Sequence, residues 1–236
     1  MSIKAALAAT TLIVASTPAV AQGITGGQLG VEYNAPTDGS DFGGTTYSGG
    51  LEYAITRQFS VAVDATGYNP DTLSIDGTNV TAHGIYHLSD AASAGVFYGQ
   101  DSLDGGDAQV YGIEGGTEFM GGTVEGYIGR VDGDGEDATI LGVDGAYALN
   151  QGFSVIGSAD LLSFNDDASV SRATIGAQYD MPGGPQFYAH IGTVSAEASG
   201  LAADQSFIGI GARVAFGTQR GTTFDGRSSL APVAGF

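Results

Sequence analysis

Residues 52–61 read EYAITRQFSV, and residues 146–155 read AYALNQGFSV. Both copies place a tyrosine before a short polar turn and a phenylalanine after it, and residues 178–187 (QYDMPGGPQF) form a looser third copy. Apolar and polar residues alternate on both sides of each turn. A period of two around a tight turn is typical of a β-hairpin, because successive side chains of a strand point to opposite faces.

The same alternation continues along most of the chain. Helical spacing is absent, and the many glycines, 40 among 236 residues, would destabilise helices. The expected strands are residues 27–35, 44–55, 59–67, 77–88, 92–100, 107–119, 122–131, 137–149, 153–163, 168–180, 186–195 and 205–217. The sequence therefore predicts an all-β protein built as a single repeated pattern.

The connections between these strands alternate between two kinds. Residues 56–58, 89–91, 120–121, 150–152 and 181–185 are short, whereas those near 36–43, 68–76, 101–106, 132–136, 164–167 and 196–204 are mostly longer and richer in Asp, Gly and Asn. Outer-membrane barrels have short periplasmic turns and longer extracellular loops, and their tilted strands have this length. We therefore expect a closed antiparallel transmembrane β-barrel of about 12 strands.

The two ends of the chain break the alternating pattern. Residues 1–21 have a positive start, an apolar run shorter than a membrane-spanning helix, and Ala19-Val20-Ala21 before Gln22. This pattern predicts a secretory signal peptide. Residues 22–217 form the expected barrel. Residues 218–236 contain Pro232, which disfavours a central strand, so we expect a C-terminal tail outside the sheet, placed in the periplasm or partly in the lumen.

The composition excludes several classes of function. The 26 acidic residues against 7 basic ones argue against nucleic acid as a partner, because phosphate binding needs a basic surface. The absence of cysteine removes disulfides, thiolate metal sites and cysteine nucleophiles. Export without cysteine indicates a bacterial envelope protein.

Aromatic residues gather beside the short turns. By parity they lie on the apolar face, where a ring of aromatic side chains at one level is typical of a membrane–water interface. The alternative is the ordinary preference of aromatics for strands in a soluble barrel or sandwich. The expected aromatic girdle comprises Tyr53, Phe59, Phe119, Tyr147, Phe153, Tyr179, Phe187 and Phe216.

A tyrosine, an aliphatic residue, a short polar turn and a hydrophobic strand together resemble the hairpin unit of Gram-negative porins, especially the small alphaproteobacterial porin-like proteins. The resemblance covers residues 27–217. It implies a bacterial outer-membrane protein that passes small solutes by diffusion, contacts outer-membrane lipid and lipopolysaccharide, and is inserted by the barrel-assembly machinery. The chain is too short for the sixteen strands of large trimeric porins, and its oligomeric state stays open.

The polar face of the strands would line the lumen. A wall rich in carboxylates attracts cations and repels anions, so the sequence predicts a narrow, cation-preferring pore. The alternative is a structural or surface-interaction barrel whose lumen is blocked by paired polar groups. By parity the expected lining residues are Glu32, Glu52, Asp64, Glu114, Glu118, Glu125, Asp144, Asp160, Arg172, Asp180 and Arg213.

The three histidines do not predict a metal site. His83 and His87 share a face, but four residues along a strand separate them by about 13 Å, and His190 lies far away in sequence. His87-Leu88-Ser89 resembles the His-x-Ser spacing of outer-membrane phospholipases, so a lipid hydrolase is a third hypothesis. Because no orienting group is evident for this pair, we expect no enzyme activity and no cofactor.

Overall fold

The computed structural model describes residues 23–39, 43–71, 77–103, 106–133, 137–150, 152–164, 168–182, 184–217 and 221–232. The expected signal peptide lies outside these residues. The described residues form twelve strands: β1 (Gly23–Pro36), β2 (Gly44–Ala54), β3 (Phe59–Pro70), β4 (Gly77–Ser89), β5 (Ala92–Leu103), β6 (Gly106–Phe119), β7 (Gly122–Gly133), β8 (Asp137–Asn150), β9 (Phe153–Phe164), β10 (Ser169–Asp180), β11 (Gln186–Ala198) and β12 (Leu201–Gly217).

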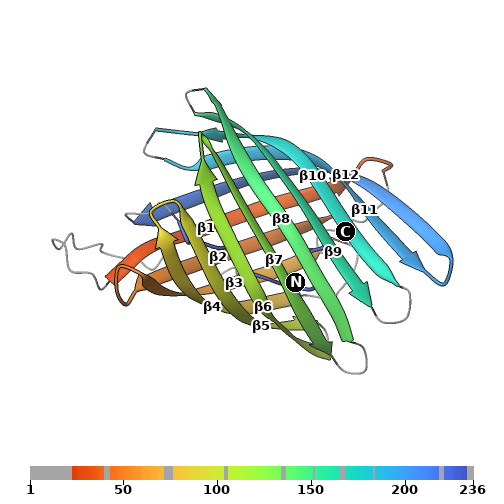
Figure 1. Cartoon of the computed structure of the whole chain (residues 1–236). Helices are drawn as coiled ribbons and strands as arrows, with labels where there is room; N and C mark the ends of the chain where they lie inside the picture. Colours follow the sequence, from red (N-terminus) through yellow and green to blue (C-terminus); the bar gives the residue numbers. More distant parts are fainter. Residues whose placement is uncertain are drawn as a thin grey trace, which may run out of the picture.

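The strands close into one antiparallel barrel (Figure 1). Each strand pairs with its sequence neighbours, and β1 pairs with both β2 and β12, from Gly26 opposite Gly217 to Pro36 opposite Phe207. Closure leaves no unpaired sheet edge, which is one of two ways to satisfy the backbone in lipid. The predicted fold class is confirmed. None of the described residues forms a helix long and apolar enough to cross a membrane.

The connections at the two ends of the barrel differ less than the sequence predicts. Leu103 and Gly106 pair across the β5–β6 hairpin, and β11 continues to Ala198, so the long connections expected at 101–106 and 196–204 are wrong. Backbone pairing continues past the point where the side-chain alternation stops. The β11–β12 turn consists of Ser199 and Gly200, both with positive φ, as a tight two-residue hairpin turn requires. We call the rim with the β2–β3, β4–β5, β6–β7, β8–β9 and β10–β11 connections the short-turn end, and the opposite rim the long-loop end.

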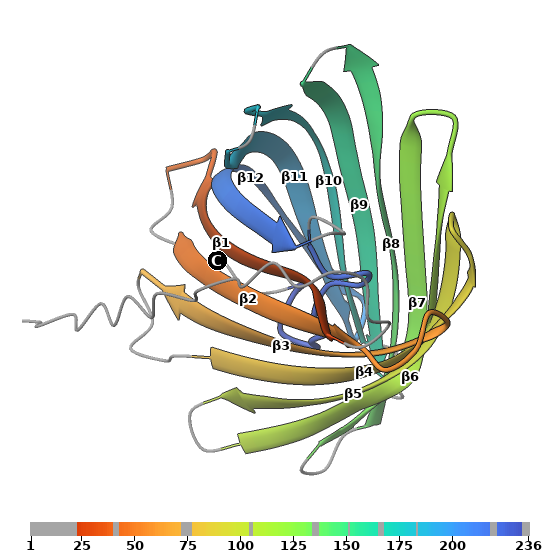
Figure 2. The same cartoon turned by 90° about the vertical axis from the view of Figure 1, so that its left-hand side faces the viewer.

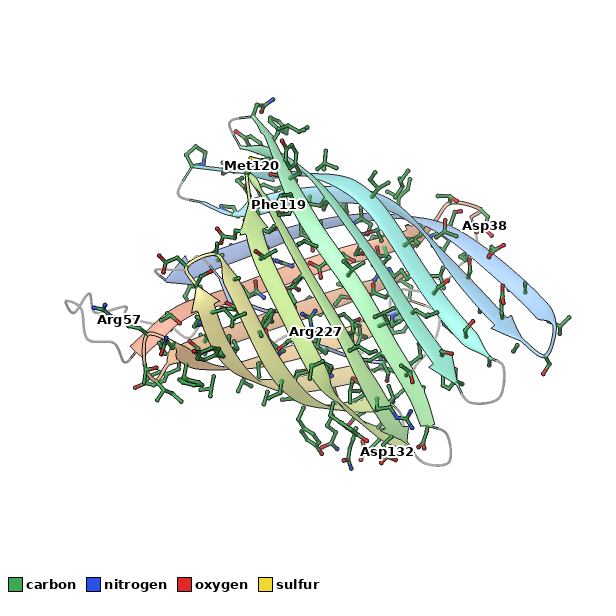
Figure 3. The ribbon with its side chains drawn as sticks, in the orientation of Figure 1. Asp38, Arg57, Phe119, Met120, Asp132 and Arg227 are labelled. Carbon is green, nitrogen blue, oxygen red and sulfur yellow. The ribbon has the colours of Figure 1, made fainter. Side chains whose placement is uncertain are left out.

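The outer surface of the barrel is apolar. Leu29, Ile113 and Ile210 are each close to 60% exposed, although they lie in the middle of strands. Seven girdle aromatics are exposed and Phe216 is partly exposed, all near strand ends at the short-turn end. Figure 3 shows Phe119 and Met120 at this end and Asp132 at the other. An apolar belt on a closed barrel has the character of a lipid-facing surface.

The inner surface has two parts, and this corrects the expectation of a uniformly polar wall. Toward the long-loop end, most inward side chains of β5–β9 are apolar and packed together, and Asp101 on β5 is the buried exception. Their cluster consists of Phe97, Val110, Tyr127, Val131, Ala138, Ile140 and Leu162. The other buried carboxylates, such as Glu52, Asp64 and Glu114, lie on the rest of the wall. Alternation in the sequence shows which residues point inward. Where a strand is apolar on both faces, however, the alternation does not show that its inward side chains are apolar.

Candidate functional site

The C-terminal segment, residues 221–232, lies inside the lumen, where Figure 2 shows it between the strands. β12 ends at Gly217, opposite Gly26, at the short-turn end. From there the segment passes Glu52 and reaches Leu230, whose side chain adjoins Gly77 at the long-loop end of β4. The segment therefore runs along the inside of the barrel from one end toward the other.

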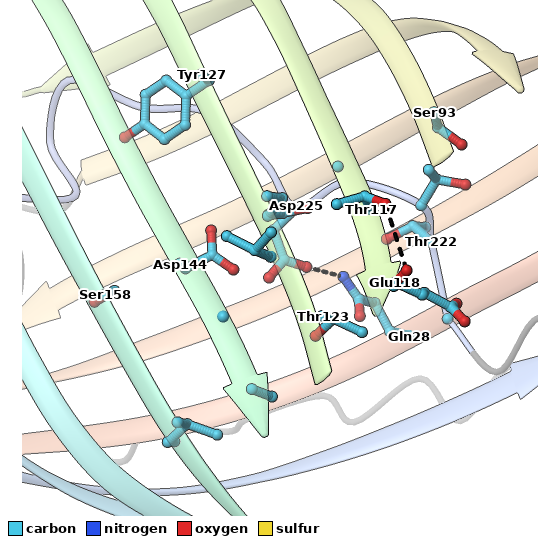
Figure 4. Close-up of a pocket in the computed structure, with 18 of the residues that line it drawn as sticks. Gln28, Ser93, Thr117, Glu118, Thr123, Tyr127, Asp144, Ser158, Thr222 and Asp225 are labelled. Atoms are coloured by element: carbon cyan, nitrogen blue, oxygen red, sulfur yellow. Dashed lines mark hydrogen bonds between the residues drawn. The ribbon is translucent and has the colours of Figure 1, made fainter. Parts of the chain in front are cut away.

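The start of the segment is held by three strands. The Thr223 amide donates a hydrogen bond to Glu52 Oε2 at 2.7 Å. The Gln28 amide donates to Asp225 Oδ1 at 2.6 Å, as Figure 4 shows, and Arg213 Nη2 donates to Asp225 Oδ2 at 3.4 Å. The positive charge of Arg213 lowers the pKa of Asp225 below its usual value, so this carboxylate stays ionised near neutral pH.

The middle of the segment carries its two largest buried side chains. Phe224 is 1% exposed and packs with Ala62 and Ile85. Arg227 is 3% exposed, with Nε 3.0 Å from Glu114 Oε2 and Nη2 3.2 Å from Glu125 Oε1. Its guanidinium lies over the Tyr127 ring, 4.4 Å from the centroid. Two carboxylates and an aromatic face therefore enclose one cation. We call the site formed by Glu114, Glu125 and Tyr127 the guanidinium cage.

The end of the segment converges on Asp101, which is 2% exposed. Asp101 Oδ1 accepts from Ser228 Oγ at 2.7 Å, and Oδ2 accepts from the Ser229 amide at 2.7 Å and its hydroxyl at 2.6 Å. The carbonyl of Arg227 also accepts from Asn79 Nδ2 and Thr81 Oγ1. Hydrogen bonds to a charged acceptor are the stronger kind, so Asp101 is the main anchor here.

Glycines in the wall make room for the segment. A Cβ at Gly26 would overlap the carbonyl oxygen of Gly221. A Cβ at Gly95 or Gly116 would meet the Phe224 ring at 3.0 and 3.3 Å. Gly26, Gly95 and Gly116 therefore shape a seat for the C-terminal segment.

A cavity of about 720 Å³ remains beside the segment. Its lining includes the turn residues Arg57 and Asp90, so the cavity reaches the short-turn end. Farther in it is bounded by Glu32, Arg172 and Asp160, together with parts of the segment itself. The cavity can hold water and small polar solutes, and its walls carry charges of both signs.

The sequence-predicted lining residues fall into several groups. Glu52, Glu114, Glu125 and Arg213 contact the C-terminal segment. Arg172 lies 3.5 Å from Glu32 and donates to the Ala231 carbonyl.

The other predicted lining residues have partners on the wall or lie near the rim. Asp64 lies 3.3 Å from His83 Nε2, and Asp160 accepts from the Tyr127 hydroxyl. Asp144 is opposite Glu125 in the β7–β8 register. Two more lie toward the short-turn end: Glu118, which is exposed on the cavity lining, and Asp180, which accepts from Gln178.

Two important residues were missed by sequence reasoning. Asp101 falls in an expected loop, whereas the structure places it on the inner face of β5. Arg227 falls in a tail without alternation. A signal for Arg227 did exist, since a wall with this excess of carboxylates needs counter-charges, and Arg227 lies in a polar run, TTFDGRSS.

The histidines belong to the wall's polar contacts. His83 bridges Asp64 and Glu114, and His190 lies near Glu32. Within the described ranges, no cluster of three or more His, Cys, Asp or Glu side chains could hold a metal ion.

The hydrolase hypothesis gains contacts but no complete site. His87 contacts Ser93 and Ser60 at 2.9 and 3.0 Å, whereas Ser89 accepts a bond from the Ala91 amide. Glu52 is 3.6 Å from His87 Nε2, beyond hydrogen-bond distance. Ser60 holds that nitrogen more closely. Glu52, the carboxylate that a catalytic triad would use to orient His87, instead accepts a hydrogen bond from the Thr223 amide of the C-terminal segment.

Comparison with solved structures places this barrel among known ones. A structure titled NanC porin superposes with a TM-score of 0.59, 11% identity, and coverage of 78% of this chain and 98% of that one. The chain has a porin-type barrel fold. The KdgM porin in complex with disordered oligogalacturonate gives a TM-score of 0.55 at 11% identity, covering 79% and 97%. A bacterial polysaccharide outer membrane secretin gives 0.51 at 9%, covering 80% and 98%. No family model matches the sequence, and no curated protein matches it significantly.

Proposed function

We propose that this protein is an outer-membrane channel of the small alphaproteobacterial porin-like type, which passes small solutes by diffusion. The observation that carries the proposal is the 720 Å³ cavity inside a closed barrel whose exterior is apolar. The porin-type fold supports it, since solved porins share the architecture. In this conformation the C-terminal segment occupies part of the lumen and narrows the passage of the channel.

The charge of the wall supports a preference for cations. The cavity is lined by Glu118 at the short-turn end and by Glu32, Asp144 and Asp160 farther in. Among the described strand residues deep in this lining, the positive charges are Arg172 and Arg213. Excess negative charge in a confined, low-dielectric passage concentrates cations and repels anions. We therefore expect the channel to transport cations and neutral polar solutes.

One observation favours the second candidate, a structural barrel with a blocked lumen. The C-terminal segment reaches the long-loop half, where Leu230 adjoins Gly77, and the apolar cluster on β5–β9 lies in the same half. A barrel closed in this way would carry its function on its outer loops. The two candidates differ in one property: a channel must open when the segment is released, whereas a structural barrel stays closed.

The discriminating experiment is ion conduction by purified protein in planar bilayers. We expect discrete, small steps from the wild type, larger steps from Arg227→Ala, and a reversal potential in a KCl gradient that shows preference for K⁺. Arg130→Ala, at an exposed outward position on β7, is the matched control and should behave as wild type. Silence from both the wild type and Arg227→Ala would refute the channel and favour the structural barrel.

The remaining parts of the proposal concern export and surroundings. Residues 1–21 direct secretion and are removed, the barrel-assembly machinery inserts the strands, and lipid and lipopolysaccharide cover the apolar belt. Recovery of the protein from the periplasm without detergent would contradict this placement, because the apolar surface would then need another cover.

A further inference from the structure

The guanidinium cage is a preformed cation site. The Glu114 side chain is fully buried, and Glu125 is 15% exposed. Both come from neighbouring strands, β6 and β7, whose pairing fixes their separation. Tyr127, on the same strand as Glu125, presents its ring to the cation. Two carboxylates with an aromatic face recognise a planar, delocalised cation better than a compact, strongly hydrated ion such as K⁺.

The occupant of this cage is held by contacts that can be reversed. Each hydrogen bond between the described part of the C-terminal segment and the strands involves a side chain, and no backbone ladder joins the two. The segment is continuous with β12 through a few residues only. It can therefore leave the wall without breaking the strand pairing that closes the barrel.

We propose that the guanidinium cage is a binding site for small solutes that carry a guanidinium group, and that Arg227 occupies it as an internal competitor. A guanidinium solute and the C-terminal segment exclude each other, so the solute opens the passage that it uses. The binding step stands on the cage alone. The passage of the solute through the barrel rests on the proposed channel function.

Competition has a measurable consequence for the C-terminal segment. A solute that binds only when the segment has left raises the population of the released state by a factor of 1 + [L]/Kd. With a Kd on the order of 10 mM, a concentration of 100 mM gives about a tenfold increase. The factor does not depend on how stable the docked state is, provided that release can be measured.

Thiol labelling measures release in a chain that has no cysteine of its own. Ser228→Cys places a thiol beside Asp101 at a position that is 3% exposed. We expect slow maleimide labelling that accelerates about tenfold in 100 mM methylguanidinium chloride. The rate should stay constant in 100 mM KCl or tetramethylammonium chloride, which lack planar N–H donors. Ser89→Cys, in an exposed turn, controls for the reactivity of the reagent. Equal acceleration by all three salts would overturn the proposal.

Calorimetry on a vacated cage provides the second measurement. In Arg227→Ala, folded as judged by strand content and heat-modifiable mobility, methylguanidinium should bind with a millimolar Kd. Binding should disappear in Arg227→Ala/Glu125→Gln and be absent from the wild type. No heat from folded Arg227→Ala would overturn the cage. Should that variant fail to fold, the labelling experiment still decides.

The two proposals fail in different ways. Methylguanidinium binding together with silent bilayers would leave the cage standing and refute the channel. Conducting steps without methylguanidinium binding or accelerated labelling would leave the channel standing and refute the cage.

Discussion

Asp101→Asn is expected to release the C-terminal segment while leaving the barrel folded. Asp101 accepts three hydrogen bonds from Ser228 and Ser229, at 2.6–2.7 Å, and one from Asn79. Asparagine keeps one acceptor oxygen and replaces the other with an NH₂ group, which would face donors instead of accepting from them.

The magnitude follows from these contacts. Hydrogen bonds to a charged group contribute about 1.5–3 kcal/mol each, and the two from Ser229 are lost when the NH₂ group replaces Oδ2, so docking should weaken by about 3–6 kcal/mol. At 1.4 kcal/mol per factor of ten, the released population rises by about 10²–10⁴. The strands keep their pairing, because Asp101 still lies opposite Ala108 in the β5–β6 ladder.

Native-state proteolysis measures this population. Trypsin cleaves after arginine, and the Arg227 carbonyl is covered by Asn79 and Thr81 in the docked state. When reclosing outpaces cleavage, the rate tracks the released fraction. The fragment beginning at Ser228 should form about 10²–10⁴ times faster in Asp101→Asn than in wild type. Asp132→Asn, at an exposed position, is the control. A change below about threefold in a folded barrel would refute the reasoning.

Three further outcomes test other parts of the account. Gly26→Ala should release the segment in the same proteolysis assay, because its Cβ would overlap the segment backbone, whereas Gly67→Ala, with nothing within 4 Å, should match wild type. The pKa of Asp225 is lowered by the neighbouring arginine, so its contribution to docking is present above about pH 4 and lost as the pH falls through that lowered value. The protection factors of the segment's amides, which correct for the intrinsic exchange rate at each pH, should therefore fall below about pH 4, and this fall should be smaller in Asp225→Asn. Ile113→Arg, in the apolar belt, should reduce the free energy of unfolding in lipid by about 2–4 kcal/mol, as measured by urea titration. Gln109→Arg, nearer the rim, should reduce it by only about 0–1 kcal/mol. Equal effects of the two substitutions would contradict a lipid-facing belt.

The barrel could be predicted from the sequence because each strand pairs with its neighbours in the chain, so that each hairpin is marked by a local pattern of residues. The period of two in residues 52–61 and 146–155 identifies the hairpins, and parity places Glu114 and Asp160 on the inner face, where the structure has them. Strand ends were less predictable, since backbone pairing continues through residues 101–103 after the alternation has ended.

The C-terminal segment could not be placed from sequence. Its seat is assembled from strands far apart in the chain, such as Gln28 on β1 and Asp101 on β5. Its own conformation is neither strand nor helix, so no periodicity marks it. The charge imbalance of the wall calls for counter-charges, but it does not single out Arg227 as one of them.

A reversible crosslink can hold the C-terminal segment in the lumen, where it narrows the passage of the proposed channel. Asp101 Oδ2 and Ser229 Oγ are 2.6 Å apart, and because cysteine is one atom shorter than aspartate, cysteines at both positions should form a disulfide after a small shift of the segment toward β5, in a chain otherwise free of thiols. We predict that the oxidised double variant (Asp101→Cys, Ser229→Cys) gives little current in planar bilayers and that reductant produces larger, cation-preferring steps. Failure of the pair to crosslink, or the same conductance before and after reduction, would contradict it.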